Sequence, residues 1–227
     1  MWAVIKKEFK SYFLSPMGYV VVGILLFVSS VFFWLTSVQI GSVELSALYY
    51  YMALYGLIIA APILTMRMFA EERKEGTEQL ILTTPISITK VVFGKLIAAL
   101  GVIMIAILIS FIYYIIVLFF AKTSIVPVLT SMCGFILISI ASISVGMFAS
   151  SITENQVIAA VSTIAFLFMT IFLENINSIF AHISLMNFYE KFPLGVISLK
   201  EIAGLVSFSI VFISLTIIVM QRRKSVK

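Results

Sequence analysis

Charge is scarce in this sequence. Only 11% of its residues are Asp, Glu, Lys or Arg, whereas soluble globular domains carry about 25%. Aspartate is absent, so every acidic residue is a glutamate. Because 62% of the chain is hydrophobic as well, the composition excludes an ordinary soluble domain.

Metal-binding and redox residues are equally rare. The chain has one histidine, His182, and one cysteine, Cys133. A zinc site needs several His, Cys or acidic ligands, and a single cysteine cannot form an internal disulfide. The Glu71-Glu72 pair resembles the paired glutamates of a metal-independent intramembrane protease family. That family carries an Arg four positions after the second Glu, where this chain has Gly76, so we predict that the chain is not an enzyme.

A nucleotide-binding loop is also missing. The only Gly-Lys pair, Gly94-Lys95, is followed by Leu96 where a phosphate-binding loop needs Ser or Thr, and Thr89 occupies the position of the loop's first Gly. We therefore predict that this chain binds no cofactor of its own. If ATP supplies energy, another subunit must bind and hydrolyse it.

Long apolar runs make up most of the rest. A membrane-spanning helix needs about 20 mostly apolar residues. Six stretches qualify: roughly 17–36, 47–66, 96–120, 128–150, 156–173 and 202–220. We therefore expect an all-α polytopic membrane protein whose six transmembrane helices form one domain over residues 1–227.

The distribution of Lys and Arg predicts the orientation. With six spans, twelve of these residues fall on the side of the termini and three (Lys122, Lys191 and Lys200) on the other. Basic residues are enriched on the cytoplasmic side of membrane proteins. Both termini are therefore predicted to be cytoplasmic, and the net charge of +5 needs no nucleic acid to explain it.

The predicted spans contain essentially no ionisable side chains. Transporters driven by ion gradients usually place such groups within the membrane. This absence argues against a secondary transporter, although sodium sites made of hydroxyl and backbone oxygens remain open.

The first fifteen residues are too polar to span a membrane. We predict an amphipathic helix over 1–15 that lies in the membrane interface against lipid headgroups; the alternative is a frayed basic tail. The apolar and basic residues that define this pattern are Trp2, Ile5, Phe9, Lys6, Lys7 and Lys10.

Small residues form an i, i+4 ridge on the fourth predicted span. They are Gly134, Ser142, Gly146 and Ser150. Small side chains let another helix approach closely. The ridge predicts helix packing within the chain, with a dimer interface as the alternative.

The region 174–200, on the predicted outer side, is more apolar than a solvent loop. We expect short helices here that re-enter the membrane, which is tolerable where protein covers their backbone.

Charged residues gather in the connector between the second and third spans. Gly76 interrupts this charged stretch, and Thr77 is a good N-cap residue for a second short helix that Pro85 ends. Leu80 and Leu82 give that helix an apolar surface. The pattern over 67–90 predicts a docking surface for a partner, against the alternative of a solvated loop.

The strings KKEFKSYFLSPMGY (6–19) and FAEERKEGTEQLILTTPISITKVVFGK (69–95) make the chain resemble the permease subunits of ABC-2 type ATP-binding-cassette exporters. The resemblance extends over nearly the whole length and is closest to permeases of the gliding-motility and copper-site-maturation types. In such permeases the stretch between spans two and three reads as an acidic pair, basic residues, Gly-Thr, an apolar run, Pro, and then Gly-Lys at the start of span three. The matching positions are Glu71, Glu72, Arg73, Gly76, Thr77, Leu80, Leu82, Pro85, Gly94 and Lys95.

This resemblance implies a coupling helix that sits in a groove of an ATPase subunit. Residues assigned to ATPase coupling are Glu71, Glu72, Arg73, Glu75, Gly76, Thr77, Leu80, Leu82 and Pro85. The implied partners are two ABC ATPase subunits, which hold ATP and Mg, a second copy or a paralogous permease that completes a dimer, and membrane lipid. The implied location is the bacterial cytoplasmic (inner) membrane.

The uncharged, aromatic-rich interior favours a lipid-like, peptidic or glycan-lipid substrate moved by ATP-dependent export. The alternative is a membrane scaffold or mechanotransmission subunit that couples an ATPase to an extracytoplasmic partner without moving cargo.

Overall fold

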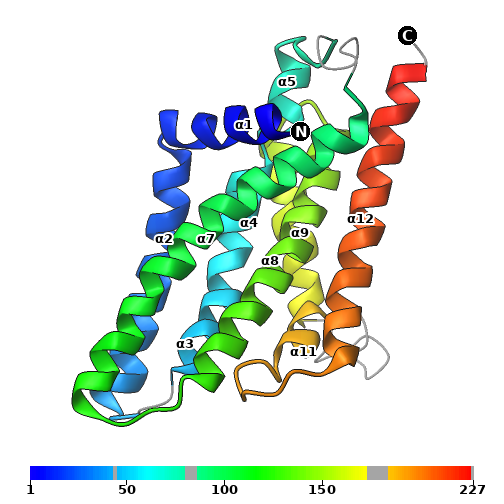
Figure 1. The fold of residues 1–227 in the computed structure, drawn as a ribbon. Coiled ribbons are helices and arrows are strands. Elements are labelled where there is room, and N and C mark those ends of the chain that lie inside the picture. Colours follow the sequence, from blue (N-terminus) through cyan, green and yellow to red (C-terminus); the bar gives the residue numbers. More distant parts are fainter. Residues whose placement is uncertain (43–44, 80–85, 173–183, 226–227) are drawn as a thin grey trace.

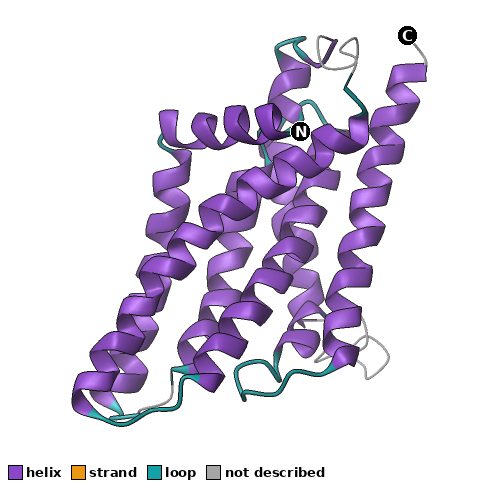
Figure 2. Ribbon diagram, in the orientation of Figure 1, coloured by secondary structure: helices purple, strands orange, loops and turns teal. Residues whose placement is uncertain are grey.

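The computed structural model describes residues 1–42, 45–79, 86–172 and 184–225, and these residues form helices without strands (Figure 2). The predicted all-α class is confirmed. The helices, together with two π-helical segments, are α1 (Trp2–Leu14), α2 (Met17–Phe33), η1 (Trp34–Gln39), α3 (Ser46–Tyr51), η2 (Met52–Gly56), α4 (Leu57–Thr65), α5 (Ala70–Lys74), α7 (Ile88–Phe120), α8 (Val126–Ile152), α9 (Gln156–Phe172), α11 (Leu185–Tyr189) and α12 (Leu199–Ser225).

Five helical stretches of the described chain are long and apolar enough to cross a membrane: Met17–Gln39, Ser46–Lys74, Ile88–Phe120, Val126–Ile152 and Leu199–Lys224. The protein is therefore a multi-pass membrane protein. The predicted span 156–173 corresponds to α9, which has 17 residues. At 1.5 Å per residue α9 is about 26 Å long, slightly less than the ~30 Å hydrocarbon core of a bilayer. Six crossings therefore stay a prediction.

The long helices stand side by side, and α1 lies across one end of the bundle (Figure 1). The N-terminus, α5 and the last turn of α12 are also at this end, which we call the α1 end, and α11 lies at the opposite end, the α11 end. The charge distribution assigns the α1 end to the cytoplasm, and this orientation remains a prediction.

Glycines on α7 allow α1 to lie directly on it. A Cβ atom added at Gly94 would be 2.9 Å from Val4 Cγ1, and one added at Gly101 would be 2.9 Å from Phe9 Cε2. Real Cβ atoms do not approach other atoms so closely, so with any larger residue at either place the side chain of Val4 or Phe9 would have to shift. Phe9, predicted to face lipid, thus packs on protein, while Trp2 is 75% exposed.

The small residues on α8 face other parts of the same chain. A Cβ atom at Gly134 would lie 2.6 Å from Phe192 Cβ, and one at Gly146 would lie 2.7 Å from Thr65 Cβ on α4. Ser142 is buried, and Ser150 accepts hydrogen bonds from the backbone just before α5 and at its first residue. In this structure the ridge is an internal packing surface.

Residues 184–200 of the predicted outer segment are described. Residues 184–198 return to the bundle and are called the cap segment here, and residues 199–200 begin α12. Helix α11 of the cap segment buries Leu185, Met186 and Tyr189. Thr130 Oγ1 donates to the Phe192 carbonyl at 2.9 Å, and Tyr189 Oη donates to the Ser131 carbonyl at 3.3 Å. The segment is therefore seated on the start of α8, whereas residues 173–183 lie outside the described part of the chain.

Candidate functional site

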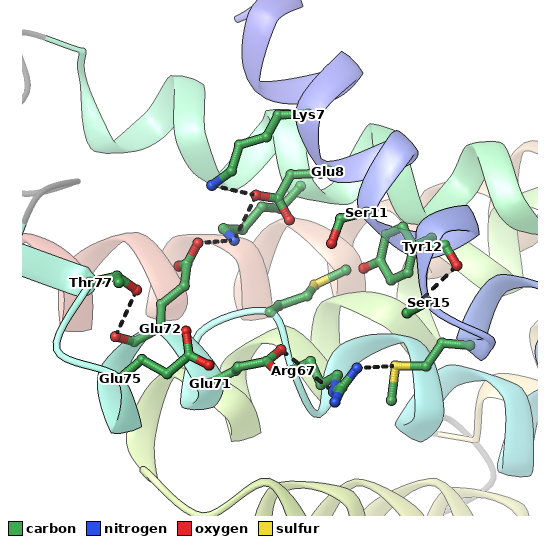
Figure 3. Close-up of a pocket in the computed structure, with 13 residues that line it drawn as sticks. Lys7, Glu8, Ser11, Tyr12, Ser15, Arg67, Glu71, Glu72, Glu75 and Thr77 are labelled. Carbon is green, nitrogen blue, oxygen red and sulfur yellow. Dashed lines mark hydrogen bonds and ion pairs between the residues drawn. The ribbon is translucent and has the colours of Figure 1, made fainter.

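A cleft of about 460 Å³ opens at the α1 end between α1, α5 and the start of α7 (Figure 3). Charged side chains of both signs line it, and most of them come from the segment that follows α4 and from α1. The residues labelled in Figure 3 are Lys7, Glu8, Ser11, Tyr12, Ser15, Arg67, Glu71, Glu72, Glu75 and Thr77.

Lys95 is the buried centre of this site, with only 2% of its side chain exposed. Its Nζ donates to Glu72 Oε1 at 2.7 Å and lies 3.2 Å from Glu8 Oε1. The ammonium also stands 5.3 Å from the centre of the Phe69 ring, within the range of a cation–π contact. A buried charge is tolerated only when it is well paired. The lysine therefore joins α7 to α1 and to α5.

Three residues of α1 at i, i+4 spacing form the α1 side of this contact between α1, α5 and α7. Val4 packs on Gly94, Glu8 pairs with Lys95, and Tyr12 Oη donates to the Leu64 carbonyl at 3.1 Å. Burial raises the pKa of the Tyr12 hydroxyl far above its ordinary value, and the charges of Glu8 and Glu72 raise this pKa further. Tyr12 is therefore a neutral hydrogen-bond donor at physiological pH.

Helix α5 is held on the last turn of α8. Ser150 Oγ accepts hydrogen bonds from the backbone N–H groups of Phe69 and Ala70, both at 3.1 Å. The first N–H groups of a helix have no partner within the helix, so this hydroxyl from another helix supplies one. Arg73 Nη1 donates to the Ile152 carbonyl at 2.9 Å, and Arg73 Nε lies 2.9 Å from Glu154 Oε1.

Replacing Ser150 with Ala is expected to lower the free energy of unfolding by about 2 kcal/mol, because two buried N–H groups lose their acceptor. Ser144→Ala is the matched control, since Ser144 is equally buried but donates only to the Ile140 carbonyl of its own helix. Thermal unfolding of both variants in detergent measures the difference. Equal unfolding temperatures would contradict this role of Ser150.

A glycine turn follows α5. Gly76 has φ +73°, a left-handed conformation that glycine adopts without strain. Thr77 donates its hydroxyl to the Glu72 carbonyl at 3.2 Å, and residues 78–79, directly after it, are helical. Glu78 is only 8% exposed and pairs with Arg223 of α12 at 3.2 Å. Leu80, Leu82 and Pro85, also predicted for this site, lie outside the described residues.

The remaining predicted residues line the cleft or lie elsewhere on α1. Arg67 and Glu71 form the i, i+4 pair that their spacing predicts, at 3.5 Å. Lys7 lies 3.7 Å from Glu8. Glu75, Lys6 and Lys10 are exposed, and Ile5 is half-buried.

Sequence reasoning overlooked several members of the site. Glu8 and Tyr12 were assigned no role in this site. Arg223 and Lys95 counted toward the charge distribution, and Lys95 also entered the search for a nucleotide-binding loop and the resemblance, but neither was given a partner. The i, i+4 spacing of Val4, Glu8 and Tyr12 could have revealed the face of α1 that meets the bundle.

Comparison with known families matches residues 2–208 to the model of the ABC-2 family transporter protein. The chain belongs to the ABC-2 transporter family. The match extends from α1 into α12 and includes the whole cleft. The protein is therefore a transmembrane permease subunit of an ABC transporter, and membership implies association with an ABC ATPase. No curated protein matches the chain.

Proposed function

We propose that this ABC-2 permease is the membrane part of an ATP-driven exporter, powered by two separate ATPase subunits that hold ATP and Mg. The segment 67–90 would be the coupling element that seats in an ATPase subunit. A second copy or a paralogous permease would complete the dimer around the transport path in the bacterial inner membrane.

The observation that carries this proposal is the way residues 67–79 are held. Lys95 ties Glu72 to α7 and, through Glu8, to α1, while Ser150 and Arg73 tie the same segment to the end of α8. If an ATPase subunit displaced a solvated loop, the loop would change its own shape and the helices would stay in place. A segment with buried polar links to three helices passes the displacement to those helices.

A lipid-like, peptidic or glycan-lipid substrate fits the interior of the predicted spans. These stretches are rich in apolar and aromatic residues and essentially free of ionisable ones. A membrane path without fixed charges is poorly suited to concentrating a small ion.

The test is co-expression with the ABC ATPase encoded nearest to this chain in its genome. Deleting Gly76-Thr77 is expected to abolish co-purification of the ATPase, because the turn that presents the coupling element is lost. Glu72→Ala is expected to leave the complex intact but to uncouple ATP hydrolysis from the permease, so that adding permease no longer changes the hydrolysis rate. Glu190→Ala, at an exposed carboxylate of the α11 end, is the matched control.

Normal retention and normal ATP hydrolysis in the deletion variant would overturn the coupling role of this segment. A wild-type chain that retains no ABC ATPase at all would favour the scaffold alternative.

A further inference from the structure

Helix α12 carries an ion pair at each of its ends. At the α1 end, Arg223 Nη1 lies 3.2 Å from Glu78 Oε1, and these side chains are 22% and 10% exposed. At the α11 end, Glu201 Oε1 lies 2.6 Å from Lys191 Nζ, and the Glu201 side chain is 5% exposed. The two α12 residues are separated by about 33 Å at 1.5 Å per residue, close to the thickness of the hydrocarbon core.

The two pairs attach α12 to one segment at each end of the bundle. Glu78 follows the Gly76 turn in the proposed coupling element, residues 67–90, which is called the coupling segment from here on. Lys191 belongs to the cap segment, and the same segment is pressed on α12 at Gly204, where an added Cβ would lie 2.9 Å from Phe188 Cγ. The cap segment is thus held by α12 on one side and by Thr130 and Ser131 of α8 on the other.

The middle of α12 is built differently from its ends. Ser207, Ser209 and Thr216 donate their hydroxyls to carbonyls of α12 itself. Exposed side chains such as Ile210 and Ile218 cover its outer face. Toward the bundle, Phe212 packs on Phe148 and Phe166, with ring centres 5.8 and 5.3 Å apart. Apolar contact is not directional, so α12 as a whole can shift along its neighbours by a small distance while its charged ends keep their partners.

We propose that α12 is a rigid rod that transmits movement of the coupling segment to the cap segment, with Glu78–Arg223 and Glu201–Lys191 as its positioning pairs. This inference rests on the proposed function, since ATP binding by the partner supplies the movement. The Lys95 junction links the coupling segment to α1 and α7 at the α1 end only. Helix α12 would carry the displacement to the opposite end of the bundle.

The experiment measures accessibility of the cap segment in the permease–ATPase complex. In a Cys133→Ser background, Leu194→Cys places a thiol at a position of the cap segment that is 73% exposed. Its reaction rate with a membrane-impermeant maleimide is measured with and without a non-hydrolysable ATP analogue. We expect the analogue to change this rate about fivefold or more, the lower range of typical coupling between sites.

Charge changes at the α1 end test the rod directly. Arg223→Glu should abolish the nucleotide-dependent change, and the swapped pair Glu78→Arg with Arg223→Glu should restore it. Lys224→Glu is the matched control, because the neighbouring lysine is exposed and the same charge change there should have no effect. At the other end, Glu201→Lys should also abolish the change, Lys191→Glu added to it should restore the change, and Lys200→Glu should leave it intact.

Retention of the ATPase is measured on the same samples, which separates the two hypotheses. A wild-type complex that retains the ATPase but shows no nucleotide-dependent labelling overturns the rod and leaves the permease function standing. The rod is also overturned if Arg223→Glu keeps the change, or if the swapped pairs fail to restore it in stable complexes. A wild-type chain that retains no ATPase overturns both hypotheses.

Discussion

Replacing Lys95 with Met is expected to lower the free energy of unfolding by about 3–5 kcal/mol, as removal of one partner from a buried ion pair typically does. The ammonium is the shared partner of Glu8 and Glu72, whose side chains are both only 14% exposed. Without it, two carboxylates of like charge remain in the same buried space. Unfolding temperature in detergent and the yield of folded protein measure the effect.

Lys90→Met is the matched control for Lys95, since Lys90 lies on the same helix and is exposed. It should unfold like the wild type. Neutralising the two carboxylates in the Lys95→Met background, with Glu8→Gln and Glu72→Gln, should recover much of the lost stability. If Lys95→Met is as stable as Lys90→Met, the junction of α1, α5 and α7 does not depend on this charge.

Gly146→Leu is expected to prevent close packing of α8 on α4. Even a Cβ atom at this position would lie 2.7 Å from Thr65 Cβ and 2.9 Å from Thr65 Cγ2. Overpacking of a tight interior costs about 1–3 kcal/mol and sometimes more, and both contacting helices lie in the buried centre of the bundle. We expect a large fall in unfolding temperature, because neither helix backbone can move without disturbing its other contacts.

Gly23→Leu is the matched control for Gly146. An added Cβ at Gly23 meets no atom within 4 Å, so this change should be neutral or slightly stabilising, since Leu favours helices more than Gly. Thr65→Ala in the Gly146→Leu background should recover part of the stability by removing Cγ2 and the hydroxyl. Equal unfolding temperatures for Gly146→Leu and Gly23→Leu would contradict the close contact between α8 and α4.

Parts of the candidate site were predictable because they depend on neighbours in sequence. Arg67 and Glu71 have the i, i+4 spacing of a helical pair and lie 3.5 Å apart, although residues 66–69 form a turn between α4 and α5. Gly76 was expected to interrupt the charged stretch, and its φ of +73° agrees with a turn at that residue. Thr77 donates its hydroxyl to the Glu72 carbonyl, and its predicted capping of the next helix stays a prediction because residues 80–85 lie outside the described part of the chain.

The partners of Lys95 and Glu78 were not predictable in the same way. No partner was predicted for Lys95, but the structure buries it against Glu8 and Glu72. Arg223 is 145 positions from Glu78. No local period links such residues, because their proximity depends on how α1, α7 and α12 pack.

The sequence by itself determined that this protein is helical and multi-pass in a membrane, and its motifs placed it in the ABC-2 family. Hydropathy and motif spacing are properties of short windows, so they can be interpreted without coordinates. Only the tertiary structure decided which side chains residues 67–79 contact, that the small residues of α8 pack inside the chain, and that α12 carries an ion pair at each of its ends. Each of these depends on contacts between helices far apart in sequence, which no single window contains.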